Sequence, residues 1–201
     1  MSSKKKIAVL ASGSGTNLQA IIDAIKSDKL PDAEIVIVIS NKKDAFALQR
    51  AKDTKIEAVF IDPKESKNHE DYDKKLIEVI NKYKVDLIVL AGYMKILTDG
   101  FVNAFPEKII NIHPALLPDF GGKGMYGKYV HRAVLKSGVK ETGCTVHFVT
   151  TEVDTGPIIA QRRTPVMTGD TVETLSKRVL EEEHKLLVEA IMRVLSSSCQ
   201  I

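Results

Sequence analysis

Short apolar runs alternate with amphipathic stretches along the whole chain, and this alternation limits the folds it can adopt. Runs typical of buried strands fall near residues 6–11, 34–39, 57–61, 85–91, 108–112, 143–149 and 157–165. Helical patterns fall near residues 16–27, 44–54, 70–83, 98–104, 128–137 and 171–195. Strand–helix alternation favours an α/β fold of the Rossmann-like kind, a mostly parallel twisted sheet of about seven strands with helices on both faces.

The last helix has the clearest predicted start. Asp170 is a candidate N-cap, and Glu173 three residues later completes the pattern of a capping box. Beyond the helix, residues 196–201 form a Ser-rich tail that is expected to fray.

Length and charge favour one domain that binds small molecules. The chain has 201 residues, which suits a single domain: a phosphate-binding half with a βαβαβ pattern to about residue 92, and a catalytic half over about 93–195. The net charge is only +3 and the lysines are scattered. This distribution argues against nucleic acid as the main partner, while a small anion needs only a local positive site.

The N-terminus and the cysteines favour a cytoplasmic protein. Residues 1–11 superficially resemble a signal peptide, but their apolar run is short and lacks a small-residue cleavage site. No stretch is long and apolar enough to span a bilayer, so no membrane partner is expected. Cys144 and Cys199 form no disulfide framework. We expect a reducing compartment, and either a monomer or a homodimer.

The run from Asn111 to Pro118 is the strongest candidate for an active site. Side chains alternate along a strand, so Asn111 and His113 share one face where the strand over 108–112 ends. Pro114 ends the ladder and biases His113 away from helical geometry. Ligands of open α/β sheets bind outside the carboxyl ends of strands. The alternative is a structural histidine with an asparagine that caps a loop.

A glycine-containing loop follows the first strand. Gly13 and Gly15 let backbone N–H groups approach an anion at the start of a helix. The dinucleotide fingerprint needs a third glycine where this chain has Leu18, and an acidic residue where it has Ser40-Asn41-Lys42. The loop therefore favours a lone phosphate monoester. The alternative is a tight turn in which Ser14 or Thr16 caps the helix.

An acidic residue in a later turn is a candidate partner for the imidazole. Asp154 precedes Thr-Gly-Pro between two strand-like runs, and its carboxylate could hold His113 and raise its basicity. The alternative is a simple turn former. His147 lies inside a strand and is interpreted as a packed, hydrogen-bonded histidine. The histidines and Cys144 have no zinc-like spacing, so no metal site is expected.

A further apolar segment ends another strand. Met94, Ile96 and Leu97 could line a slot for a flat heterocycle, with backbone groups supplying hydrogen bonds. The alternative is ordinary core at the start of a helix.

Together these segments resemble the glycinamide ribonucleotide formyltransferase family, folate-dependent enzymes of purine synthesis. The resemblance extends from residue 6 to about 195. The runs that carry it are Leu10–Ala20, Val89–Leu97, Asn111–Pro118, Gly143–Val149, Asp154–Pro157 and Glu183-His184.

The resemblance implies roles for individual residues. Asn111, His113 and Asp154 would form the catalytic set, and Glu183 would contact the ribonucleotide. The substrate phosphate would bind at Gly13, Ser14, Gly15, Thr16 and Asn17. The folate would contact His69, Met94, Lys95, Ile96, Leu97, Asn111, Val146, Thr150, Val153 and Asp154. Lys95 stands where many relatives carry arginine, which keeps the charge but loses the bidentate fork.

The reaction expected from this set is formyl transfer from 10-formyltetrahydrofolate to the amine of 5-phosphoribosylglycinamide. The amine would attack the formyl carbon, and Asn111 would donate to the oxygen of the tetrahedral intermediate. Asp154 would orient His113 and raise its pKa above about 6.5. The folate would be a cosubstrate, with no tightly bound cofactor and no metal.

Three other functions are compatible with parts of the pattern. A methionyl-tRNA formyltransferase would carry a C-terminal RNA-binding domain, and a formyltetrahydrofolate hydrolase an N-terminal regulatory domain, which this chain is too short to include. A non-catalytic nucleotide-binding module would use the glycine loop but would leave Asn111, His113 and Asp154 without a purpose.

Overall fold

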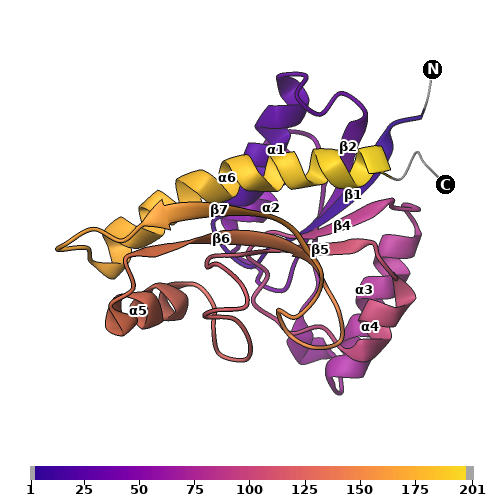
Figure 1. Ribbon diagram of the computed structural model, residues 1–201. Helices are drawn as coiled ribbons and strands as arrows, with labels where there is room; N and C mark the ends of the chain where they lie inside the picture. The colour runs from indigo at the N-terminus through magenta and orange to yellow at the C-terminus, as the bar shows by residue number, and fades with distance from the viewer. Residues whose placement is uncertain (1–2, 198–201) are drawn as a thin grey trace. The chain divides into compact units, whose positions relative to one another are not determined.

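The computed structural model describes residues 3–197, which form an α/β protein with a seven-stranded sheet (Figure 1). The strands are β1 (Lys5–Leu10), β2 (Ala33–Ser40), β3 (Glu57–Phe60), β4 (Leu87–Leu90), β5 (Ile109–His113), β6 (Glu141–Phe148) and β7 (Ile158–Pro165). All seven lie close to their predicted ranges, and β2 and β4 coincide most clearly with apolar runs. Cys199 and the end of the Ser-rich tail lie outside the described residues.

The sheet is mostly parallel, as the strand–helix alternation predicts. Its strand order is β3-β2-β1-β4-β5-β6-β7. Strand β1 pairs in parallel with β2 and β4, and β2 pairs in parallel with β3. Strands β6 and β7 pair in the antiparallel direction. Every residue of β4 is buried, which is typical of a parallel strand covered on both faces.

The six predicted helices are also present. They are α1 (Thr16–Lys26), α2 (Phe46–Asp53), α3 (His69–Asn81), α4 (Asp99–Ala104), α5 (Lys128–Ser137) and α6 (Val172–Ser197). A short 3₁₀ helix, η1 (Pro63–Glu65), was not predicted; Pro63 follows the capping residue Asp62, whose side chain accepts from the N–H of Lys64.

The predicted cap of α6 is wrong by one residue. The hydroxyl of Thr171 accepts from the N–H of Thr174, and the N–H of Thr171 donates to the hydroxyl of Thr174, so this pair forms the capping box. Asp170 instead makes two 2.8 Å hydrogen bonds to the Arg178 guanidinium. The helix continues through Ser196, where the sequence predicts a frayed end.

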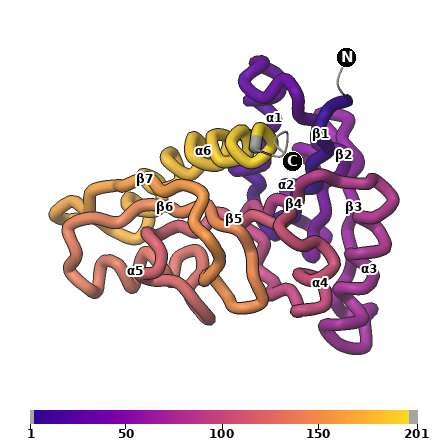
Figure 2. The backbone as a smooth tube through the Cα atoms, turned by 45° about the vertical axis from the view of Figure 1, so that its right-hand side comes forward, coloured from indigo at the N-terminus to yellow at the C-terminus, as the bar shows by residue number. Residues whose placement is uncertain are grey.

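The chain divides into two compact units, Met1–Ile110 and Asn111–Ile201. In the first unit, β1, β2 and β3 lie side by side, and α3 packs against α4 (Figure 2). In the second unit, the long helix α6 runs alongside β6 and β7 in both views. Each unit has its own apolar core, which includes Leu10 and Ile37 in the first and Val146 and Leu187 in the second.

One peptide bond and the character of the helices complete the description of the fold. The peptide bond between Leu117 and Pro118 is cis. Among residues 3–197, none of the helices has the length and apolar character needed to cross a membrane.

Candidate functional site

Strand β5 delivers an amide and an imidazole at its carboxyl end. Asn111 and His113 are separated by one residue, so both side chains lie on the same face of the strand. His113 is buried and Asn111 is half-buried. Pro114 follows, and residues 114–127 form the long connection to α5. The sequence-based placement of this pair at a strand end therefore agrees with the fold.

The carboxylate of Asp154 lies between two imidazole rings. Its Oδ2 is 3.5 Å from His113 Nδ1, and its Oδ1 is 3.6 Å from His147 Nε2. The N–H of Gly122 donates to Oδ2 at 2.9 Å. The connection after β6 therefore brings Asp154 to the pair on β5, as expected. Asp154 has a φ of 60°, a left-handed conformation that aspartate and asparagine tolerate better than most residues.

The hydrogen bonds of His113 fix where its protons lie. Nε2 is 2.8 Å from the carbonyl oxygen of Phe120, which can only accept, so Nε2 carries a proton. In the neutral ring Nδ1 is then unprotonated and faces Asp154. A proton that binds to Nδ1 is stabilised by the Asp154 carboxylate, so His113 and Asp154 together can take up and release one proton.

The expected rise in the pKa of His113 is wrong. Burial lowers this pKa, and it outweighs the Asp154 carboxylate and the Phe120 carbonyl, both of which raise it. The ring is therefore neutral at pH 7. Burial raises the pKa of Asp154, but His147, the charge of His113 and the Gly122 N–H together hold it below its ordinary value. The site thus contains a neutral imidazole beside a carboxylate.

His147 belongs to this cluster, although the sequence indicated only a packed histidine. It is buried in β6, and its Nδ1–H donates to the Phe148 carbonyl at 2.8 Å. Its Nε2 then accepts from the Asn111 Nδ2 group at 3.2 Å. This contact orients the amide of Asn111 and leaves its second N–H available. The signal in the sequence was the position of His147 near the end of the strand-like run over 143–149.

Residues of the connection 114–127 contact the same cluster. A Cβ at Gly121 would lie 2.5 Å from Leu117 Cδ2 and 3.3 Å from Asp154 Cβ, so no larger residue fits without displacing them. Gly121 is flanked by Phe120 and Gly122, which contact His113 and Asp154. Within residues 3–197, no three His, Cys, Asp or Glu side chains are grouped to hold a metal ion.

The glycine-containing loop that is predicted to bind an anion lies in the first unit, between β1 and α1. Gly15 precedes α1 with a φ of 70°, and a Cβ there would lie 2.7 Å from Ala47 Cα, so glycine is required. Neither Ser14 nor Thr16 caps the helix: the N-cap is Gly15, without a side-chain hydrogen bond, and the first turn has no acidic residue. The helix start therefore retains its partial positive charge for an anion.

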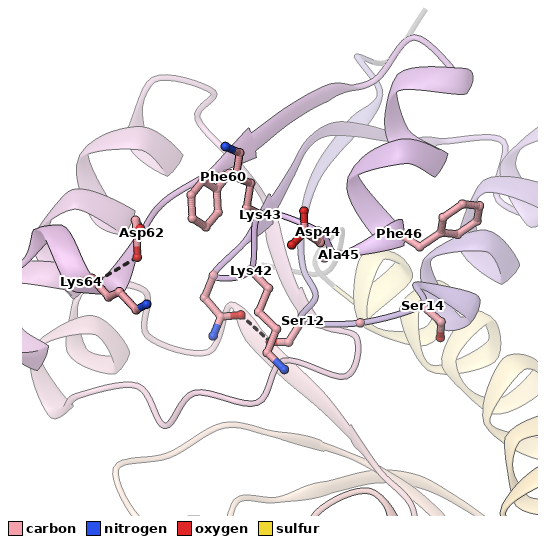
Figure 3. Close-up of a pocket in the computed structure, with 12 residues that line it drawn as sticks. Ser12, Ser14, Lys42, Lys43, Asp44, Ala45, Phe46, Phe60, Asp62 and Lys64 are labelled. Carbon is pink, nitrogen blue, oxygen red and sulfur yellow. Dashed lines mark hydrogen bonds between the residues drawn. The ribbon is translucent and has the colours of Figure 1, made fainter.

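A cavity of about 590 Å³ borders this loop (Figure 3). Its lining includes Ser12, Gly13 and Ser14 together with Lys42, Lys43 and Lys64. Figure 3 shows Ser12 and Lys42 among the side chains that line the cavity, and the Ser12 hydroxyl donates to Asn41 Oδ1 at 2.6 Å. Asp44 and Asp62 also line the cavity, so its surroundings are only weakly positive.

The segment after β4 is exposed rather than core. Met94 is 48 % and Ile96 is 51 % exposed, and α4 begins only at Asp99. The N–H of Met94 donates to the Ser12 hydroxyl at 2.8 Å, which joins this segment to the anion loop. Lys95 lies over the Tyr72 ring, with Nζ 4.9 Å from its centre. These exposed apolar side chains can contact a flat ligand.

The remaining residues expected at the site are more dispersed. His69 is exposed at the start of α3, and Thr150 and Val153 are exposed in the connection after β6. Val146 is fully buried in β6, where its side chain belongs to the core. Glu183 is buried on α6. Burial of the Cys144 thiol raises its pKa to about 12, and the negative charge of Glu183 is the second-largest cause of this rise.

The buried histidine of α5 predicts a pH effect on stability. Burial, reinforced by the charge of His113, lowers the pKa of His131 from 6.5 to about 4. The unfolded chain therefore binds a proton between pH 6.5 and 4 that the folded chain does not, and the free energy of unfolding falls as the pH is lowered through this range.

His131→Gln should remove part of this dependence. Urea unfolding at a series of pH values should give a slope between pH 6.5 and 4 that is smaller by up to about 1.4 kcal/mol per pH unit. His69→Gln, which changes an exposed histidine, serves as the control. Equal slopes for wild type and His131→Gln would contradict the low pKa.

Comparisons with known proteins show which family the chain is similar to. A family model described as formyl transferase matches residues 5–191. A chloroplastic phosphoribosylglycinamide formyltransferase of Arabidopsis thaliana is 46% identical over 94% of the chain. A phosphoribosylglycinamide formyltransferase of Haemophilus influenzae is 47% identical over 90% of the chain and 83% of its own length.

A solved structure is similar in fold as well as sequence. The glycinamide ribonucleotide transformylase 1 of Symbiobacterium toebii superposes with a TM-score of 0.89 at 46% identity, covering 94% of this chain and 86% of that one. The chain spans 64% of the length of the plant relative, so that protein has additional residues without a counterpart here.

Proposed function

The chain belongs to the formyl transferase family, and we propose that it transfers the formyl group of 10-formyltetrahydrofolate to the amine of 5-phosphoribosylglycinamide. The observation that carries this proposal is the cluster of Asn111, His113 and Asp154, in which one carboxylate lies 3.5 Å from a buried imidazole. The products are the formylated ribonucleotide and tetrahydrofolate. The proposed setting is the cytoplasm, and the proposed partners are these two small molecules.

Asn111 stabilises the tetrahedral intermediate in the proposed mechanism. Attack of the amine on the formyl carbon places negative charge on the formyl oxygen. An amide NH₂ group has two N–H donors. One of those of Asn111 is directed to His147, and the other donates to this oxygen. A donor that is held in place before the reaction has no reorganisation cost when the charge develops.

His113 and Asp154 move the proton in the proposed mechanism. The attacking nitrogen becomes acidic on forming the new C–N bond, and N10 of the folate needs a proton to leave. A neutral His113 can accept the first proton at Nδ1, where Asp154 stabilises the imidazolium, and return it to N10. The lowered pKa of His113 suits this role, since the ring starts as a base.

The phosphate of the ribonucleotide binds at residues 13–17 in this proposal. The start of α1 supports it, because it has no side-chain cap and no acidic residue in its first turn, and the positive end of a helix favours an anion. Exposed Met94 and Ile96 provide apolar contacts for the folate ring system. Glu183 contacts the ribonucleotide, as the resemblance implies.

A spectroscopic assay for deformylated folate tests the proposal. With purified protein and 10-formyltetrahydrofolate, product should form only when 5-phosphoribosylglycinamide is added, because the amine is the acceptor. Boiled protein serves as the control for spontaneous deformylation. Product that forms at the same rate without the amine would identify a hydrolase, and no product in either case would contradict the proposal.

A further inference from the structure

The geometry points to Arg50 as a positioning residue: it fixes the direction in which the anion loop presents its N–H groups. The anion loop is residues 12–15. This inference rests on the proposed function for the identity of the substrate. It concerns a residue that reaches the ligand only through the loop, so its effect on phosphate binding can be measured separately.

Arg50 joins three parts of the first unit. Its Nε donates to the Ser14 carbonyl at 2.8 Å, and its Nη1 donates to Gln19 Oε1 on α1 at 2.9 Å. The guanidinium carbon also lies 4.9 Å from the centre of the Phe46 ring. A planar guanidinium can make these two hydrogen bonds and stack on a ring at once, whereas a lysine ammonium cannot.

A second contact from the same helix acts on the preceding peptide. The N–H of Ala47 donates to the Gly13 carbonyl at 3.1 Å. Helix α2 therefore holds two consecutive carbonyls of the loop, those of Gly13 and Ser14. In a planar trans peptide the N–H points opposite to the carbonyl, so the N–H groups of Ser14 and Gly15 are directed away from α2.

These two N–H groups are available for a ligand. Across residues 3–197, neither the N–H of Ser14 nor that of Gly15 donates to a backbone carbonyl outside the helices and strands. The start of α1 adds its partial positive charge next to them. An anion that accepts from Ser14 and Gly15 thus depends on the peptide orientation that Arg50 and Ala47 maintain.

Loss of Arg50 should weaken binding of the phosphate and leave the chemical step unchanged. A hydrogen bond from a charged donor supports an effect of about 10-fold. In Arg50→Ala and Arg50→Lys, KM for 5-phosphoribosylglycinamide should rise about 10-fold, while kcat and KM for the folate stay as in wild type. Lys52→Ala, an exposed cation on the same helix, is the matched control and should resemble wild type.

The phosphate-free glycinamide riboside separates positioning from general damage to the fold. Its KM should be the same in wild type and Arg50→Lys, because it places no anion on the loop. Equal weakening of the phosphorylated and phosphate-free substrates would overturn the inference, and so would wild-type KM values in Arg50→Ala. If Arg50→Ala does not fold, Gln19→Ala provides a second variant, since it removes the other partner of the guanidinium.

Titration with inorganic phosphate distinguishes this inference from the proposed function. In wild type, phosphate should shift the amide NMR signals of Ser14 and Gly15, and the apparent Kd should rise about 10-fold in Arg50→Lys. If these shifts occur but the protein formylates a different phosphorylated amine, the role of Arg50 stands and the proposed substrate fails. If phosphate leaves both signals unchanged in wild type, the inference fails whatever the substrate.

Discussion

Asp154→Asn should leave the protein folded and reduce kcat by about 10²- to 10⁴-fold, the usual contribution of acid–base catalysis. Asparagine tolerates the left-handed φ of 60° and keeps an oxygen that accepts from Gly122. It removes the negative charge 3.5 Å from His113 Nδ1. Because burial already lowers the pKa of His113, loss of this charge lowers it further, and the imidazolium becomes costly to form.

The measurement is steady-state kcat together with thermal unfolding. Glu152→Gln is a suitable control because it removes a carboxylate from the same connection while its side chain is exposed. The control should keep the wild-type kcat, and both variants should unfold near the wild-type Tm. A wild-type kcat in Asp154→Asn would remove this carboxylate from the mechanism.

Asn111→Ala should reduce kcat by about 10²- to 10³-fold, with little change in either KM. The lost N–H is needed mainly when charge develops on the formyl oxygen, so binding of the ground state changes little. Alanine also leaves His147 Nε2 without its donor at 3.2 Å. We therefore expect a small loss of stability in addition to the kinetic effect.

Asn103→Ala, an exposed asparagine of α4, controls for removal of an amide elsewhere. Rapid mixing of the variant with saturating substrates would show whether the chemical step itself is slow. If Asn111→Ala raised KM and kept kcat, the amide would serve in ground-state binding, and the proposed stabilisation of the intermediate would be wrong.

The strands and helices could be predicted because each is encoded by a local pattern. Strand β4 lies within the uninterrupted apolar run Leu87–Ala91, and α5 begins and ends at its predicted residues. The cap of α6 could not be predicted in the same way. Asp170 and Thr171 are both good capping residues, and the choice depends on Arg178, whose guanidinium binds Asp170.

The cluster was partly predictable for a different reason. The spacing of Asn111 and His113 is local, and the need of an imidazole for a carboxylate pointed to Asp154. Asn111 and His147 lie on different strands and are 36 residues apart in the sequence, so no local pattern encodes their contact. The direction of the His113 pKa also escaped prediction, because it depends on how deeply the fold buries the ring.

The left-handed backbone of Asp154 affects how saturation mutagenesis of this position should be interpreted. Most side chains incur a steric cost at a φ of 60° whatever their chemistry, and glycine and asparagine are the main exceptions. A library selected only for soluble expression should therefore be enriched in those residues before any selection for turnover. Inactive bulky variants would report backbone conformation as much as the missing carboxylate, whereas an inactive asparagine variant isolates the charge.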